Sequence, residues 1–145
     1  MIKIVCVGKL KEKYWQDAAA EYIKRLGRFT KLEICELAEG TPQSESEAIL
    51  KKLDPDSYVI ALDVGGQSLS SEQLADKIEA LGLEGKSKIA FVIGGSDGYC
   101  DNVRARADLR LSFSAFTFPH QLMRVILLEQ IYRAYKINSG EKYHK

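Results

Sequence analysis

Short runs of apolar and β-branched residues alternate along the chain with segments in which apolar residues recur at helical spacing. The strand-like runs are Ile2–Val7, Leu32–Leu37, Tyr58–Leu62, Lys88–Ile93 and Leu109–Phe113. The third and fourth runs are apolar almost throughout, which is typical of parallel strands covered by helices on both faces. This alternation predicts an α/β domain with a largely parallel sheet and flanking helices.

The limits of the first helices are predicted from capping and turn residues. The first helix carries its apolar side chains over residues 15–26 and ends near Gly27. Ser44 is expected to cap a short second helix, and Ser70 with Gln73 forms a capping box for a third. A short fourth helix is expected over residues 100–107.

The last predicted helix is unusually apolar. Pro119 is suited to its first position, and the pattern continues to about Asn138. Between Leu122 and Ile137 the polar residues are Arg124, Glu129, Gln130, Arg133 and Lys136. A surface helix of this kind would expose too much apolar area, so it must be buried inside the monomer or against a second copy. We expect a homodimer built on this helix, because two-fold dimers are the commonest oligomers.

The composition excludes several classes of protein. The 145 residues are 46% hydrophobic and 28% charged, which fits a single domain over residues 1–145 and excludes a disordered or fibrous chain. The apolar run at the N-terminus is too short for a secretory signal or a membrane span. Cys6, Cys35 and Cys100 lie far apart, so we expect free thiols, a cytoplasmic location and no metal site.

The net charge of +1 conceals a segregation along the chain. Residues 1–31 hold eight Lys and Arg against three Asp and Glu, residues 32–85 hold three against twelve, and residues 86–145 hold ten against five. Solvated helix faces explain such a pattern, but the two basic ends can also converge on one surface that meets RNA. The expected phosphate contacts are Lys9, Lys11, Lys13, Lys24, Arg25 and Arg28.

Three predicted strands end abruptly in small or turn-forming residues. The segments are VIALDVGG at 59–66, FVIGGSDG at 91–98 and LSFSAFTFPH at 111–120, and residues 63–66 are expected to end the first of these strands. In open α/β sheets ligands bind at the carboxyl ends of strands, where glycine lets main-chain groups approach a ligand closely. A pocket of main-chain groups and apolar side chains, such as Leu62, Phe113 and Phe116, suits an adenosine group.

Two motifs that would cradle phosphate are missing. The chain lacks G-x-G-x-x-G after its first strand, where residues 7–11 read VGKLK. Residues 80–87 lack the first glycine of a P-loop and lie between a helix and a strand, the reverse of the required order. A pocket without a phosphate cradle favours S-adenosylmethionine, whose nucleoside half is uncharged.

Longer motifs resemble the SPOUT superfamily, and within it the large-subunit ribosomal RNA pseudouridine N3-methyltransferases. The motifs are IGGSDG, LSFSAFTFPHQLMRVILLEQIYRAYKI and a terminal KYHK, and the resemblance extends over essentially the whole chain. Many relatives have Pro and Glu where this chain has Ser96 and Asp97, so a turn former and a carboxylate are kept. The resemblance implies a C-terminal trefoil knot, which periodicity alone cannot reveal.

The resemblance also implies a function. It implies methyl transfer from S-adenosylmethionine to N3 of a pseudouridine in large-subunit (23S) ribosomal RNA, on the assembled ribosome. The cofactor would bind in the knot, and a homodimer would complete each active site with the partner's C-terminal tail. The residues that match the family's cofactor positions are Leu62, Gly94, Gly95, Phe113, Ser114, Ala115, Phe116, Thr117 and Phe118.

The imide proton on N3 must leave during methylation, so a base or an anion-stabilising group is expected. We assign this role to Arg133 and to the tail residues Tyr143, His144 and Lys145, with His144 able to accept a proton near neutral pH. Arg133 can also simply pair with Glu129 one turn earlier. Two other functions stay open: a SPOUT methylase of transfer RNA, and a non-catalytic nucleotide-binding module.

Overall fold

The computed structural model describes residues 1–143 and contains ten regular elements. In chain order they are β1 (Ile2–Val7), α1 (Lys13–Leu26), β2 (Leu32–Leu37), α2 (Pro42–Lys52), β3 (Tyr58–Ser68), α3 (Ser71–Leu83), β4 (Ile89–Ile93), α4 (Asp101–Arg106), β5 (Leu109–Ser112) and α5 (His120–Asn138).

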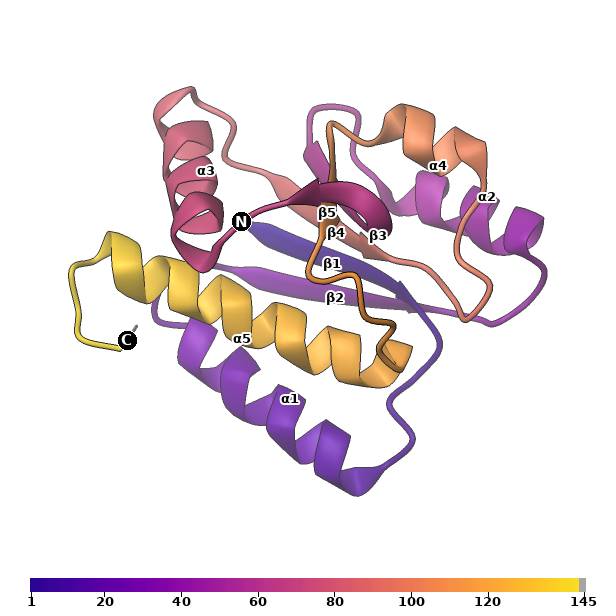
Figure 1. The fold of residues 1–145 in the computed structure, drawn as a ribbon, viewed down its shortest axis with the longest axis horizontal. Helices are drawn as coiled ribbons and strands as arrows, with labels where there is room; N and C mark the ends of the chain where they lie inside the picture. The colour runs from indigo at the N-terminus through magenta and orange to yellow at the C-terminus, as the bar shows by residue number, and fades with distance from the viewer. Residues whose placement is uncertain (144–145) are drawn as a thin grey trace.

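The five strands form one parallel sheet in the order β2-β1-β4-β3-β5. Helices α1, α3 and α5 cover one face of the sheet, and α2 and α4 cover the other (Figure 1). The predicted α/β architecture with flanking helices is confirmed. Because all five strands run in the same direction, their carboxyl ends meet along one edge of the sheet.

The core has one part on each face of this sheet. Alternate residues of β1 divide between the parts: Ile2 and Ile4 pack on the side of α1, α3 and α5, and Val5 and Val7 pack on the side of α2 and α4. All five residues of β4 are buried, as expected for the central strand of a sheet covered on both faces.

The prediction that residues 63–66 end the third strand is wrong. β3 runs on to Ser68, and its pairing with β5 shifts register between Leu62 and Gln67, both of which lie opposite Leu111. A Cβ on Gly66 would come within 2.6 Å of the main chain of Arg110. Glycine here therefore lets two strands approach closely across a bulge, and does not stop the first of them.

Two helix starts also differ from the predictions. Thr41, not Ser44, is the N-cap of α2, because its side chain accepts a 3.1 Å hydrogen bond from the Ser44 amide while Pro42 occupies the first helical turn. Pro119 is the N-cap residue of α5 and not its first helical residue, since its ψ of 136° is extended.

Helix α5 lies between α1 and α3 on the sheet (Figure 1). Its buried residues are Arg124, Leu127, Leu128, Ile131, Tyr132 and Ala134. Part of its apolar character is therefore explained by packing within one protomer. Its remaining apolar residues, including Leu122, Val125 and Ile126, are half-buried, and the expected dimer stays a prediction.

Within residues 1–143, no helix combines the length and apolar character needed to cross a membrane. Over the same range, no group of three or more His, Cys, Asp or Glu side chains is placed to hold a metal ion.

Candidate functional site

One cavity of about 270 Å³ lies where the bulge of β3, which begins after Leu62, meets the carboxyl ends of β4 and β5. Strand β3 lies between the other two, with Ala61 opposite Val92 of β4 and Leu62 opposite Leu111 of β5. The predicted cofactor residues that line the cavity are Leu62, Gly94, Gly95, Phe113, Ser114, Phe116, Thr117 and Phe118. Ala115 is exposed and does not line it. The structure thus brings together the three segments that sequence reasoning selected, although the first of them continues as a strand to Ser68.

Two glycines shape the wall that β4 contributes. A Cβ on Gly94 would lie 3.1 Å from both the Gly98 carbonyl carbon and Cδ2 of Tyr99, and a Cβ on Gly95 would lie 2.7 Å from the carboxylate of Glu45. The Gly98 amide donates a 2.9 Å hydrogen bond to the Gly95 carbonyl, which closes a tight turn. The loop packs so closely on its neighbours that larger residues at positions 94 and 95 would displace it.

The segment after β5 forms the opposite wall and is held by its own serines. The Ser112 hydroxyl donates to the Ser114 carbonyl at 3.1 Å, and the Phe116 amide donates to the Ser114 hydroxyl at 3.0 Å. Phe116 is 76% exposed and lies at the mouth of the cavity. An exposed aromatic ring at the mouth of a cavity can pack against a planar ligand.

A charged cluster at one side of the cavity centres on Asp63. Its carboxylate accepts a 2.9 Å hydrogen bond from the Gly65 amide and lies 3.5 Å from the guanidinium groups of Arg104 and Arg110. Burial alone would raise the pKa of Asp63, but the bonds from Gly65 and Tyr99 and the two arginine charges outweigh it and hold the pKa below its usual range. Asp63 is therefore ionised at neutral pH.

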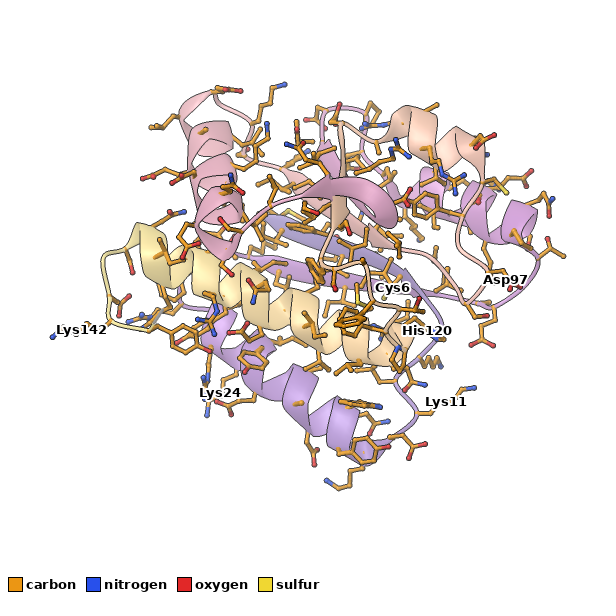
Figure 2. The ribbon with its side chains drawn as sticks, viewed as in Figure 1. Cys6, Lys11, Lys24, Asp97, His120 and Lys142 are labelled. Carbon is orange, nitrogen blue, oxygen red and sulfur yellow. The ribbon has the colours of Figure 1, made fainter. Side chains whose placement is uncertain are left out.

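Sequence reasoning did not assign to the site the four titratable residues that line the cavity: Asp63, Tyr99, Arg104 and His120. His120 is the first residue of α5. Asp97, which is in the same loop as Gly94, lies at the outer edge of the molecule (Figure 2). Tyr99 follows the glycine loop directly and Arg104 lies in α4, the next helix, so proximity to that loop is the signal that could have identified them.

The predicted activating residues lie elsewhere in the protomer. Arg133 binds the Glu129 carboxylate through Nη2 at 2.7 Å, and the Tyr143 hydroxyl donates to the same carboxylate at 3.0 Å. The Arg133 guanidinium also lies over the Tyr143 ring, 4.8 Å from its centroid. Arg133 is thirteen residues beyond His120 on α5, which is about 20 Å along the helix axis. His144 and Lys145 lie outside the described residues.

The contacts of this cluster change its acid–base properties. Its bond to Glu129 raises the pKa of Arg133, so the guanidinium stays charged. Burial, followed by the bond to Glu129, raises the pKa of Tyr143 to about 12. The phenol of Tyr143 is therefore protonated at neutral pH and can donate a hydrogen bond but cannot act as a base.

Three of the six predicted phosphate contacts are engaged in ion pairs. Lys13 pairs with Asp17, Arg25 with Glu21 and Arg28 with Glu141, at N–O distances of 2.7 to 2.8 Å. Lys11 and Lys24 project outward near the two ends of α1 (Figure 2). Lys9 lines a separate hollow of about 410 Å³ that it shares with Arg124.

Comparison with protein families matches nearly the whole chain. A family model described as "Predicted SPOUT methyltransferase" matches residues 1–144. The ribosomal RNA large subunit methyltransferase H of Clostridium novyi (strain NT) is 58% identical, and that of Bifidobacterium adolescentis is 57% identical. A putative ribosomal RNA large subunit methyltransferase H of Methanococcus maripaludis is 53% identical. Each of these alignments covers 99% of both chains.

Solved structures with the same fold are more distant in sequence. A probable methylase family protein from Haemophilus influenzae Rd KW20 superposes with a TM-score of 0.62 at 18% identity, over 99% of this chain and 70% of that one. A putative methylase family protein from Neisseria gonorrhoeae has a TM-score of 0.56 at 14% identity, over 99% of this chain and 86% of that one. At such low identity these likenesses concern the fold alone.

Proposed function

This chain belongs to the SPOUT methyltransferase family, within the group of ribosomal RNA large subunit methyltransferase H proteins, and on that premise we propose that it methylates N3 of a pseudouridine in large-subunit (23S) ribosomal RNA. The methyl donor is S-adenosylmethionine, and the substrate is the assembled ribosome in the cytoplasm. Residues 1–145 act as one SPOUT domain, whose C-terminal segment forms the trefoil knot.

The observation that carries this proposal is the cavity where the bulge of β3 meets the ends of β4 and β5. Its lining fits S-adenosylmethionine. Leu62, Phe113 and Phe118 form an apolar surface for the nucleoside, and Asp63 and Arg104 place a negative and a positive charge at one side of the cavity. The close packing of Gly94 and Gly95 keeps main chain, rather than side chains, on the β4 wall. When bound, S-adenosylmethionine supplies a methyl group on a positively charged sulfur.

The contribution of the protein to the reaction is mainly alignment. Methyl transfer needs the nucleophile, the methyl carbon and the sulfur in line, and holding them so is worth several kcal/mol. The main-chain walls at Leu62 and Gly94 hold the donor, and the loop over residues 113–118 closes over it. The proposed cofactor set comprises Leu62, Gly94, Gly95 and the stretch Phe113, Ser114, Ala115, Phe116, Thr117 and Phe118.

The groups proposed to activate the base come from the partner subunit. Arg133 lies ten residues beyond Met123, the last residue of α5 that lines the cavity, which is about 15 Å along the helix axis. A second copy of the chain would therefore have to bring its Arg133 to this cavity. The half-buried apolar residues Leu122, Val125 and Ile126 give α5 a face for this dimer. Arg133 and Tyr143 hold the base and stabilise negative charge on it, His144 accepts the N3 proton, and Lys145 helps to hold the base.

The RNA is held by positive charge around α1. Lys9, Lys11, Lys13, Lys24, Arg25 and Arg28 come from α1 and the segments on either side of it. The ion pairs of Lys13, Arg25 and Arg28 are exposed, and such pairs contribute at most about 1 kcal/mol, so phosphate can replace the carboxylate.

Mapping of modified nucleosides by mass spectrometry tests the proposed reaction. Ribosomal RNA from cells without this chain should lack one methylated pseudouridine, and the purified protein should restore it on ribosomes with S-adenosylmethionine. Methylation of transfer RNA instead of ribosomes would favour another SPOUT activity. A complete set of methylated bases in the deletion strain, together with no binding of S-adenosylmethionine in calorimetry, would contradict any methyltransferase function.

A further inference from the structure

Tyr99 connects two of the main-chain segments that form the cavity. It follows the glycine loop, lines the cavity and is 7% exposed. Its hydroxyl lies 3.1 Å from the carbonyl oxygen of Leu62 and 3.3 Å from Oδ2 of Asp63, so it donates to β3 where the bulge begins. A residue from the loop after β4 thereby holds the main chain of β3 at Leu62.

The ring of Tyr99 supports the other wall. A Cβ built on Gly94 would lie 3.1 Å from Cδ2 of Tyr99, so the ring packs directly against the main chain of Gly94. Gly94 has no side chain that could separate its main chain from the ring. One side chain thus contacts both main-chain segments, at Leu62 through its hydroxyl and at Gly94 through its ring.

Surrounding groups hold Tyr99 in this position. The Asp63 carboxylate is itself held by the Gly65 amide and by Arg104 and Arg110. The Arg104 guanidinium lies over the Tyr99 ring, 5.2 Å from its centroid. Burial, and then the charge of Asp63, raise the pKa of Tyr99, so its hydroxyl keeps the proton that it donates.

We propose that Tyr99 is a positioning residue for the methyl donor, which fixes the Leu62 carbonyl and the Gly94 main chain before the ligand binds. This inference rests on the proposed function for the identity of the ligand. A wall that is already ordered binds with less loss of conformational freedom than one that must be ordered by the ligand. Loss of the hydroxyl should therefore weaken binding of the donor more than it slows the reaction at saturation.

The test compares Tyr99→Phe with a matched control, Tyr58→Phe, at the first residue of β3 and outside the cavity lining. Calorimetry with S-adenosylhomocysteine gives Kd, and methyl transfer to ribosomes gives KM for S-adenosylmethionine and kcat. For Tyr99→Phe, Kd and KM should rise about 3- to 10-fold, the effect of one neutral hydrogen bond, and kcat should stay within about twofold. Tyr58→Phe should leave all three constants unchanged.

Two outcomes would overturn the inference while leaving the proposed function intact. One is a Kd of Tyr99→Phe within twofold of wild type. The other is a lower urea midpoint without a change in Kd or KM, which would make Tyr99 purely structural. Tyr99→Leu, which also lacks the hydroxyl, must weaken binding at least as much as Tyr99→Phe. Failure of the wild-type protein to bind either ligand would instead refute the proposed function, and the inference with it.

Discussion

The guanidinium of Arg124 in α5 donates a 2.8 Å hydrogen bond to the carbonyl oxygen of Gly8, directly after β1. The same guanidinium pairs with the carboxylate of Glu36 near the end of β2, and the Arg124 side chain is only 3% exposed. Arg124 therefore joins α5 to the carboxyl ends of two neighbouring strands.

Replacement of Arg124 by Met should destabilise the fold by about 2–4 kcal/mol, because it leaves the Gly8 carbonyl and the Glu36 carboxylate without their partner. Urea unfolding at pH 7 measures the change. Lys13→Met removes an ion pair in which Lys13 is 84% exposed, so it should change the free energy of unfolding by less than about 1 kcal/mol. Equal effects of the two substitutions would contradict a structural role for Arg124.

Gly66→Ala should destabilise the protein by about 1–3 kcal/mol, since the new Cβ would lie 2.6 Å from the main chain of Arg110. Gly65→Ala is the matched control: its Cβ would meet Asp63 Oδ1 at an ordinary 3.6 Å. Thermal unfolding of both variants checks the prediction. If Gly66→Ala melts at the same temperature as Gly65→Ala, the close approach of β3 and β5 at the bulge is wrong.

Protonation of Glu141 should loosen the C-terminal segment in acid. Hydrogen bonds from Arg28, Ser139 and Lys136 lower the pKa of Glu141 from 4.5 to about 2. Because the folded-state pKa is the lower one, the stabilisation is complete above about pH 4.5 and is lost as the pH falls towards 2. The difference in unfolding free energy between wild type and Glu141→Gln should therefore be constant near pH 7 and shrink below pH 4.5. A difference that does not depend on pH would show that the carboxylate is not held in this way.

Mixed dimers should recover activity if each site uses two subunits. Gly94→Val should block the cavity and Arg133→Ala removes the group that we propose comes from the partner, so each variant alone should be inactive. In a co-expressed mixture half of the dimers hold one intact site, which gives about a quarter of wild-type activity. As a control, Gly94→Val mixed with the double variant Gly94→Val/Arg133→Ala should recover nothing. An inactive first mixture would place Arg133 outside a shared site.

Neutralising Lys9 and Lys11 together should weaken RNA binding and reduce its dependence on salt. Each lost phosphate contact lowers the slope of log Kd against log salt concentration by about 1, so the double variant to Gln should lower it by about 2. Lys51→Gln with Lys52→Gln, at the end of α2 on the other face of the sheet, serves as the control. Unchanged RNA affinity in the first variant would remove Lys9 and Lys11 from the proposed interface.

By itself the sequence determined the elements and the edge of the sheet that carries the site. The apolar runs predicted all five strands, and the small residues after Leu62, Ile93 and Ser112 indicated where a ligand could be held. Such signals are local, because periodicity and turn chemistry depend on neighbouring residues. The same local reasoning wrongly interpreted Gly65 and Gly66 as the end of a strand.

Only the tertiary structure decided which distant groups meet. The contacts of Arg124 with Gly8, of Arg28 with Glu141 and of Tyr99 with Leu62 join residues 116, 113 and 37 positions apart. Residues brought together in this way leave no periodic trace in the sequence, because their proximity depends on strand order and on the placement of α5. Local propensity therefore specifies the pieces of this protein, whereas the order β2-β1-β4-β3-β5 determines which of them share a cavity.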